Sequence, residues 1–296
     1  MFVLGATFLS SCAGPGAVLR DLPGRPVVGQ PSIAPIVHWE EIREYDGKKV
    51  HFHMVRADLD DDRCEVRVAC GDDPDGPDGP AVSRLVNPVR LAQAHGLAVG
   101  VNANAFLAAP NASGIREMAR GWYLGKPIIP VGHVVVDGTS LEGCQHERLM
   151  VWIDRDNRAH TGETPDLTTV QQGVSDWGGD LLRHGEYVST QQGPNHRSMA
   201  GTDATGRWLF LLVADGAARG TRNGATFREC ADVLLENGCT EAIALDGGGS
   251  VVMTLAHPAE VKPNRWIEGP VVESSGRTDL RPVPVMFGLS ARRKSR

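Results

Sequence analysis

The stretch Glu241-Ala-Ile-Ala-Leu-Asp246-Gly-Gly-Gly-Ser250-Val-Val-Met-Thr254 decides how the rest of the sequence is interpreted. Its two apolar runs are typical of buried strands, whereas three consecutive glycines pack nothing and weaken a strand. Bare backbone at this point indicates a sharp turn or the close approach of another group. Two interpretations fit the stretch alone: a tight hairpin capped by Asp246, or a cradle for a ligand.

Length and composition set the outer limits. A chain of 296 residues forms one large domain or two small ones. The hydrophobic fraction of 41% and the charged fraction of 22% are ordinary for a soluble globular protein. Because the formal net charge is −6, we expect neither nucleic acid nor an anionic membrane surface as an electrostatic partner.

The N-terminal segment indicates export. The apolar run Phe2–Leu9 is too short to span a bilayer as a helix and is typical of the core of a signal peptide. Leu9-Ser10-Ser11-Cys12 resembles a bacterial lipobox, although no Lys or Arg precedes the run. We therefore expect a signal peptide and lipobox over residues 1–12 and a lipid anchor on Cys12. The product would be a membrane-anchored lipoprotein in the periplasm or at the cell surface; the alternative is a short apolar terminus with a chance cysteine.

Both ends of the chain look like accessory segments. Residues 13–36 are rich in Pro and Gly, which predicts a tether without regular structure. Residues 291–296 form a basic tail exposed to solvent. The folded domain is expected to extend over residues 37–290.

Cysteine and histidine patterns give no metal site. No C-x-x-C motif occurs, so zinc ribbons and thioredoxin-type redox chemistry are unsupported. Local spacing allows the disulfides Cys64–Cys70 and Cys230–Cys239 in an exported protein, with buried free thiols as the alternative. His51 and His53 share one face of a predicted strand, but the neighbouring sequence shows no third ligand. We expect no metal and no cofactor.

Several strands follow from apolar runs and alternation. They are predicted at His38–Arg43, Lys49–Leu59 and Leu149–Asp154. Pro282–Gly288 is predicted to be an edge strand, because proline cannot donate to a ladder. The Gly- and Asp-containing segment Gly173–Gly193 predicts a long irregular loop.

The region before the opening stretch predicts a strand, a helix and a strand. Residues 200–215 predict a hairpin that ends in Asp215, and Thr226 with Glu229 has the spacing of a capping box at the start of a helix. If the strands that end in Asp215 and Asp246 are parallel neighbours, both carboxylates emerge at one sheet edge. The predicted fold class is α/β (mixed α+β): one domain with a twisted mixed sheet and few helices.

Five short segments occur in a fixed order along the chain: Val101–Phe106, His196–Gly201, Asp215-Gly216, Gly224–Glu229 and Leu245–Ser250. This order resembles that of the phosphodiester glycosidase family, which includes the enzyme that uncovers mannose 6-phosphate by removing N-acetylglucosamine from a phosphodiester. Two positions depart from the family pattern: Ser198-Met199 stands where Thr-Ala is usual, and Asn104-Ala-Phe106 replaces an aromatic pair. The sugar pocket is therefore expected to differ.

The resemblance implies a sugar-1-phosphodiester as substrate, and the residue types fit. Arginine binds phosphate oxygens with two N–H groups, which suits Arg197. Bare amides can cradle an anion. A stabilised phosphate leaving group reduces the need for acid assistance, so one base or nucleophile could suffice. The predicted catalytic residues are Asp246, Asp215 and Glu229; the predicted substrate- and phosphate-binding residues are Arg197, Asn102 (for sugar hydroxyls), His196, Gly247, Gly248, Gly249, Ser250 and Thr226.

Three functions remain open at this level. The first is an exported hydrolase of sugar-1-phosphodiesters or related glycosides in envelope polysaccharide or glycoconjugates. The second is a lipid-anchored carbohydrate-binding protein without turnover, and the third is a metal-dependent phosphodiesterase that uses the aspartates with His196. Glu229 can also be a capping residue alone, and Asp215-Gly216 a plain turn.

Overall fold

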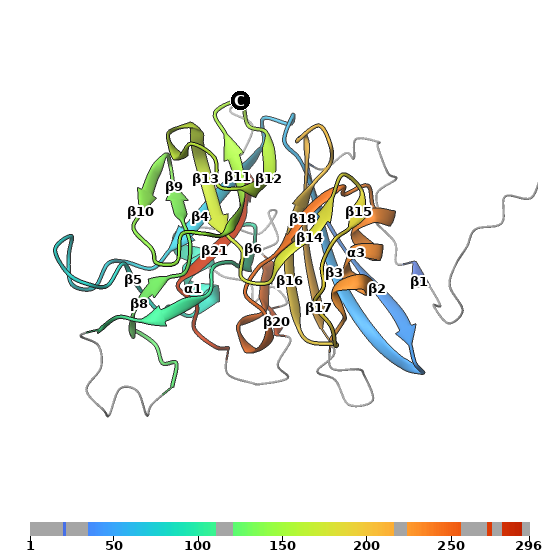
Figure 1. The fold of residues 1–296 in the computed structure, drawn as a ribbon, viewed down its shortest axis with the longest axis horizontal. Helices are drawn as coiled ribbons and strands as arrows, with labels where there is room; N and C mark the ends of the chain where they lie inside the picture. Colours follow the sequence, from blue (N-terminus) through green and yellow to red (C-terminus); the bar gives the residue numbers. More distant parts are fainter. Residues whose placement is uncertain are drawn as a thin grey trace, which may run out of the picture.

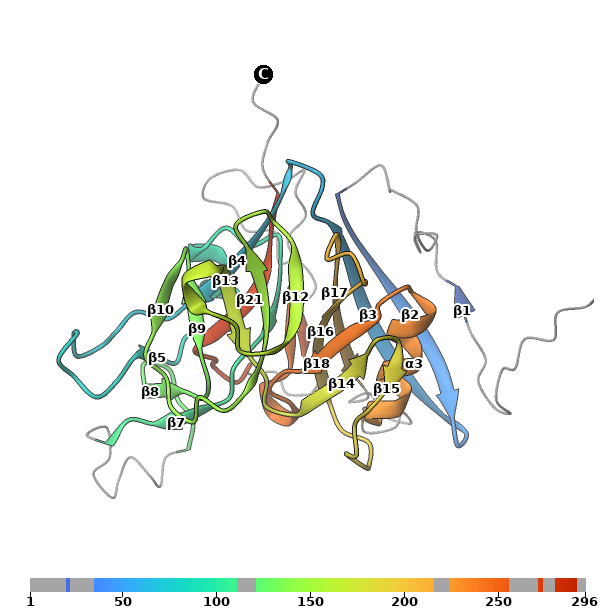
Figure 2. The same ribbon diagram turned by 45° about the horizontal axis from the view of Figure 1, so that its top comes forward.

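The computed structural model describes residues 20–21, 35–110, 121–215, 224–255, 271–273 and 280–291. The predicted signal peptide, Cys12 and the basic residues after position 291 lie outside this part of the chain. Figures 1 and 2 show a strand-rich molecule in which a large sheet carrying α3 lies beside a group of smaller sheets. Within the described part, neither α-helix is long and apolar enough to cross a membrane.

The large sheet has eight strands in the order β1-β2-β3-β17-β16-β18-β14-β15, and every pair of neighbours is antiparallel. The prediction of few helices is confirmed, whereas the prediction of a mixed sheet is wrong. The bounds are β1 Arg20–Asp21, β2 Ile36–Tyr45, β3 Lys48–Asp58, β14 Gly179–Arg183, β15 Glu186–Tyr187, β16 Arg197–Thr202, β17 Trp208–Asp215 and β18 Glu241–Ala244.

Three smaller sheets complete the strand content of the described residues, again with antiparallel ladders. The first has the order β20-β19-β6-β21-β4, with bounds Val271–Glu273, Val252–Leu255, Val99–Asn102, Val285–Ala291 and Cys64–Cys70. The second has the order β10-β9-β13-β11-β12, with bounds Thr139–Leu141, Val134–Val136, Val170–Ser175, Leu149–Asp154 and Ala159–Glu163. The third has the order β5-β8-β7, with bounds Ser83–Arg84, Pro127–Pro130 and Phe106–Ala108.

The large sheet buries both of its faces. One face packs against the other sheets, and alternate residues such as Val55, Leu211 and Ile243 join side chains such as Phe287 in the main core. The other face packs against helix α3 (Phe227–Glu236), with Leu212 and Ala244 in a second core. Helix α1 (Pro88–Ala94) starts at the proline, as its fixed φ favours, and packs in a separate small cluster.

The predicted strand–helix–strand unit is present as β17, α3 and β18, but its two strands are not neighbours. Strand β16 lies between them and runs antiparallel to both. The hairpin of β16 and β17 turns at residues 203–206, where the Gly206 amide donates to the Asp203 carbonyl. Because β17 and β18 still run in the same direction, both end at the sheet edge where β16 begins.

Three local predictions are wrong. The predicted tether contains β1, whose Arg20 and Asp21 pair with β2. The segment predicted as an irregular loop contains β14 and β15, and β14 pairs with β18 through a bulge. The predicted edge strand starts after its prolines, so β21 occupies a central position between β6 and β4.

The structure holds the described cysteines as free thiols, namely Cys64, Cys70, Cys144, Cys230 and Cys239. Cys64 and Cys70 stand at opposite ends of β4, so no local bridge joins them. Cys230 and Cys239 are buried, and burial raises the pKa of both thiols. The structure thus shows free thiols, of which Cys64, Cys230 and Cys239 are buried and Cys70 and Cys144 are partly exposed.

Candidate active site

The segment Asp246–Ser250 connects two sheets rather than two strands of a hairpin. Strand β18 before it belongs to the large sheet, and β19 after it belongs to the β20-β19-β6-β21-β4 sheet. Residues Gly248–Ser250 form a single turn of 3-10 helix (η3) in the connection. Of the two interpretations drawn from the sequence, the hairpin is therefore wrong.

The backbone of Asp246 is fixed by the end of β6. Its N–H donates to the Ala103 carbonyl at 2.9 Å, and its carbonyl accepts from the Asn102 amide Nδ2 at 2.6 Å. Asn102 Oδ1 also accepts from the Val252 N–H at 3.1 Å. Asn102 is 1% exposed, so in this structure its amide braces the connection instead of facing a cavity for sugar hydroxyls.

The structure shows why glycine is required at two of the three glycine positions. Gly248 has φ of +61°, a left-handed conformation that favours glycine. At Gly249 a Cβ would lie 2.9 Å from the guanidinium Nη2 of Arg281. The bare backbone thus lets a cation approach the loop, and Arg281 Nη1 also donates to Ser250 Oγ at 3.4 Å.

Two backbone N–H groups of the loop donate hydrogen bonds within the protein. The Gly248 N–H donates to the His196 carbonyl at 3.0 Å, and the Ser250 N–H donates to the Gly247 carbonyl at 3.4 Å. In this structure a cradle of three bare amides is therefore not available, because the Gly248 amide is already used. Positive charge near the carboxylate comes instead from Arg281, which sequence reasoning missed because it lies 31 positions after Ser250.

Burial sets the protonation of Asp246. It raises the pKa of the carboxyl group from 3.8 to about 6, against the opposing effects of the Ser250 hydroxyl, the Arg281 charge and the Gly247 amide. The group is thus mainly ionised at neutral pH yet close to its titration point. A carboxyl tuned in this way is suited to accept a proton or to attack an electrophilic carbon.

Arg197 begins β16 and lies on the α3 side of the sheet. Its guanidinium stacks on the Phe227 ring at 4.2 Å from the centroid, and its Nε and Nη2 donate to the carbonyls of Ala225 and Gly193. Burial lowers the pKa of Arg197 without removing its charge. These contacts fix the plane of the guanidinium, as a bidentate anion contact requires.

Arg197 and Asp246 line the same cavity of about 280 Å³. Gly247 and Gly248 belong to its wall, and so does Trp177, whose side chain is 45% exposed. Trp177 follows β13, and the guanidinium of Arg148 stacks on it at 4.7 Å. The cavity therefore combines a carboxylate, a fixed guanidinium and an accessible indole ring.

The structure places Asp215 elsewhere. It pairs with His51 in the ladder between β17 and β3, and it shares a sheet face with Val213 of the main core. Arg197 pairs with Ala214, whose side chain is on the opposite face in the α3 core. Asp215 thus reaches the predicted edge but not the lining of the 280 Å³ cavity.

Thr226 and Glu229 form the predicted capping box of α3. Glu229 N–H donates to Thr226 Oγ1 at 3.2 Å, and Thr226 N–H donates to the Glu229 carboxylate at 2.8 Å. Neither residue belongs to the described lining of the cavity. His196 is 8% exposed and contributes its backbone carbonyl to Gly248. These residues therefore support the start of α3 and the glycine loop, and they do not line the cavity.

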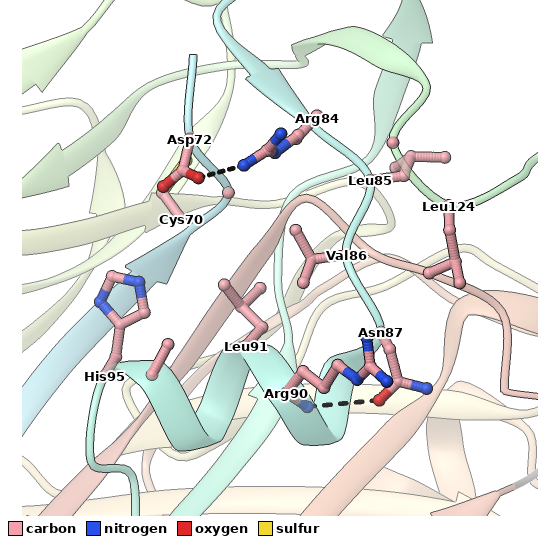
Figure 3. Close-up of a pocket in the computed structure, with 13 residues that line it drawn as sticks. Cys70, Asp72, Arg84, Leu85, Val86, Asn87, Arg90, Leu91, His95 and Leu124 are labelled. Atoms are coloured by element: carbon pink, nitrogen blue, oxygen red, sulfur yellow. Dashed lines mark hydrogen bonds and ion pairs between the residues drawn. The ribbon is translucent and has the colours of Figure 1, made fainter. Parts of the chain in front are cut away.

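A second cavity, of about 380 Å³, lies between α1 and the segment that follows β5 (Figure 3). It holds two arginines, but Arg84 forms an ion pair with Asp72 across it. The Arg90 N–H donates to the Asn87 cap of α1, as the dashed line shows. Although this cavity is larger, the carboxylate in its lining, Asp72, is 77% exposed and already paired with Arg84. The cavity at Asp246, with its buried carboxylate, is therefore the stronger candidate for catalysis.

The family model for phosphodiester glycosidases matches residues 95–290, which include Arg197, Asp246 and Arg281. The chain belongs to the phosphodiester glycosidase family. This is a family of hydrolases, and its match covers more than half of the chain.

Solved structures show the same fold at low sequence identity. The zebrafish N-acetylglucosamine-1-phosphodiester alpha-N-acetylglucosaminidase catalytic domain, auto-inhibited by its pro-peptide, has a TM-score of 0.59 and 17% identity over 94% of this chain and 89% of that one. A hypothetical protein from Synechocystis has a TM-score of 0.53 and 14% identity over 87% of this chain and 62% of that one. A Burkholderia pseudomallei protein described as exported has a TM-score of 0.52 and 14% identity over 82% and 74%. A search of curated protein sequences gave no match.

Proposed function

We propose that this member of the family hydrolyses a sugar-1-phosphodiester, with Asp246 as the carboxylate that acts at the anomeric carbon. The observation that carries the proposal is the shared cavity, in which the carboxylate of raised pKa faces the same space as the stacked guanidinium of Arg197. The zebrafish relative bears the name of an enzyme that acts on such a diester, which agrees with this substrate class.

The charges fit the bond that breaks. When the bond between C1 and the bridging oxygen is cleaved, its electron pair leaves with the phosphate, which becomes a monoester. Arg197 would bind the phosphate oxygens through the N–H groups not used for Ala225 and Gly193, and Arg281 adds positive charge beside Asp246. Charge stabilisation of the leaving group makes a second carboxylic acid unnecessary.

Asp246 supplies the other half of the reaction. Either it takes the proton of a water molecule that attacks C1, or its own oxygen bonds to C1 before water releases the sugar. Both routes require the ionised carboxylate, which the Ser250 hydroxyl and the Gly247 amide favour over the acid. Trp177 offers an exposed ring on which the apolar face of a sugar can stack.

A panel of synthetic sugar-1-phosphodiesters tests the proposal. Wild-type protein is incubated with each compound, and the released reducing sugar and phosphate monoester are quantified together, with Asp246→Asn as the matched control. We expect hydrolysis by the wild type and a loss of at least about 10³-fold in the variant. Binding without hydrolysis would overturn the proposal in favour of a carbohydrate-binding protein, and activity lost only in chelator would favour a metal-dependent phosphodiesterase.

We also propose that the enzyme acts outside the cytoplasm on envelope polysaccharide or a glycoconjugate, held by lipid on Cys12. The support is the lipobox-like Leu9–Cys12 that follows an apolar run. Metabolic labelling with a radioactive fatty acid should mark the wild type and leave Cys12→Ser unlabelled; equal labelling of both would refute the anchor.

A further inference from the structure

Two histidines and a glutamate meet on the face of the large sheet opposite Arg197. They are His38 and Glu40 on β2 and His53 on β3, and their potential ligand atoms all lie within 4.8 Å of one another. In the antiparallel ladder Glu40 pairs directly with His53, while His38 is diagonal to it opposite Val55. The pleat therefore places the three side chains on one face.

The geometry within the cluster suits a metal ion. His53 Nδ1 lies 3.6 Å from Glu40 Oε1, and the rings of His38 and His53 are nearly parallel with centroids 6.0 Å apart. Ligand atoms about 2.0–2.1 Å from a tetrahedral zinc ion lie about 3.4 Å apart. The observed separations reach that arrangement through modest side-chain rotations, without a change in the strands.

His53 supplies an independent sign of a missing ligand. Its side chain is 9% exposed, and within the described residues Nδ1 is a buried polar atom that makes no hydrogen bond. Buried polar atoms in folded proteins normally have a partner, and an ion is one explanation for an exception. Here the atom that makes no hydrogen bond is the one that faces Glu40.

The charge of the surroundings favours a cation. Asp215 lies on the same sheet face, two positions beyond the residue that pairs with His53, and its negative charge acts on that imidazole. Two imidazoles with carboxylate oxygens form a donor set that zinc and similar divalent transition metals prefer, whereas calcium and magnesium prefer oxygen ligands alone.

We propose that His38, Glu40 and His53 bind one divalent transition-metal ion of the zinc class, with Asp215 as the candidate for the fourth position. His53 and Ser198, a residue of the cavity lining, both pair with Val213 of β17, so the Cα atoms of His53 and Ser198 are two strand spacings, about 10 Å, apart. The side chain of Arg197 is on the opposite face of the sheet from the three ligands. The ion would link β2 to β3 and stiffen the ladder that borders β17, the strand that pairs with the Arg197-bearing strand β16. It takes no part in the proposed hydrolysis.

The test measures metal binding directly. The full chain is stripped with a chelator, dialysed and titrated with Zn²⁺ by calorimetry, and elemental analysis gives the zinc content. We expect one zinc ion per chain, and a rise in Tm of about 5 °C at roughly 100-fold excess of Zn²⁺ over Kd. Separate His38→Gln, Glu40→Gln and His53→Gln variants should each bind zinc at least about 10-fold more weakly.

His184→Gln is the matched control. His184 also lies beside a glutamate, Glu241 at 3.1 Å, but its side chain is 86% exposed and no third ligand is grouped with it among the described residues. Its substitution should leave the zinc affinity unchanged. If the buried His53 variant fails to fold, Glu40→Gln decides, because that side chain is 42% exposed. Absence of stoichiometric binding, or unchanged affinity in Glu40→Gln, would overturn the proposal.

Discussion

Two strands of the large sheet lead to an aspartate at the same edge, Asp215 as the last residue of β17 and Asp246 two residues after β18, and the two carboxylates have different surroundings. Asp246 has left the ladder after β18 and lines the cavity with Arg197, where burial raises its pKa to about 6. Asp215 is still part of the ladder with β3 and faces the histidines on the other side. Both carboxylates therefore lie at the same edge of the sheet. The face that each one reaches depends on whether its residue is still paired in the ladder.

The largest expected effect separates these two aspartates. Asp246→Asn should lower kcat/KM by at least about 10³-fold, because it removes the only carboxylate among the described residues that line the cavity. Asp215→Asn should lower it by less than about 10-fold. The measurement is steady-state hydrolysis of the best diester from the panel. A comparable loss at both positions would show that the two carboxylates act together, and the distinction drawn from the ladder would fail.

A substitution of Arg197 tests whether the cavity that it shares with Asp246 binds phosphate. Arg197→Lys keeps a charge but loses the planar fork and its stack on Phe227, so we expect kcat/KM to fall by about 10²-fold. Arg84→Lys in the second cavity is the matched control and should change kcat/KM by less than about twofold. The reverse order of effects would move the active site to the cavity of Figure 3.

The pH profile sharpens the comparison. Below pH 6 the Asp246 carboxylate becomes protonated, so kcat/KM should fall by about tenfold per pH unit on acidification and level off above about pH 7. The same acidic limb should persist in Asp215→Asn. A profile that stays flat from pH 7 down to pH 5 would contradict the role of Asp246.

The smallest effect needs no substrate. A carboxyl group whose pKa is raised on folding binds protons more readily in the folded state, so its contribution to stability decreases as pH rises from about 4 to 6. Asp246→Asn should therefore increase the free energy of unfolding at pH 7 by about 1–3 kcal/mol. The gain should shrink towards pH 4, as denaturant titrations at both pH values would show. A loss of stability at pH 7 would mean that the loop needs the charge.

The sequence predicted much of the fold because many elements carry local signals. Apolar runs located β3, β11 and β17, and the Thr226–Glu229 spacing located the start of α3. It could not predict β14, whose short glycine-bounded strand is stabilised by pairing with β18 and not by its own pattern. The prolines misled in the opposite direction, since β21 begins just after them.

Some residues of the candidate site could likewise be predicted from the sequence, and others could not. Asp246 and Arg197 follow from motifs, and the structure brings them to one cavity. Arg281 carries no local signal, because it lies beside Gly249 in the structure although the two residues are far apart in the sequence. The face on which Asp215 lies depends on the register of β17 with β3, which alternation of apolar residues across a fully buried strand cannot reveal.

The bracing of Asp246 by β6 has a mechanical consequence. Arg197 is a residue of β16 in the large sheet, whereas the backbone of Asp246 is hydrogen-bonded to Asn102 and Ala103 at the end of β6, which belongs to the sheet packed against it. The separation between the two charged groups is therefore a measure of how the sheets sit against each other. A core substitution such as Phe287→Leu touches no substrate, yet a shift of the sheets by a fraction of an ångström would detune the pair. In this molecule the packing between the sheets thus sets the relative position of the two charged groups of the active site.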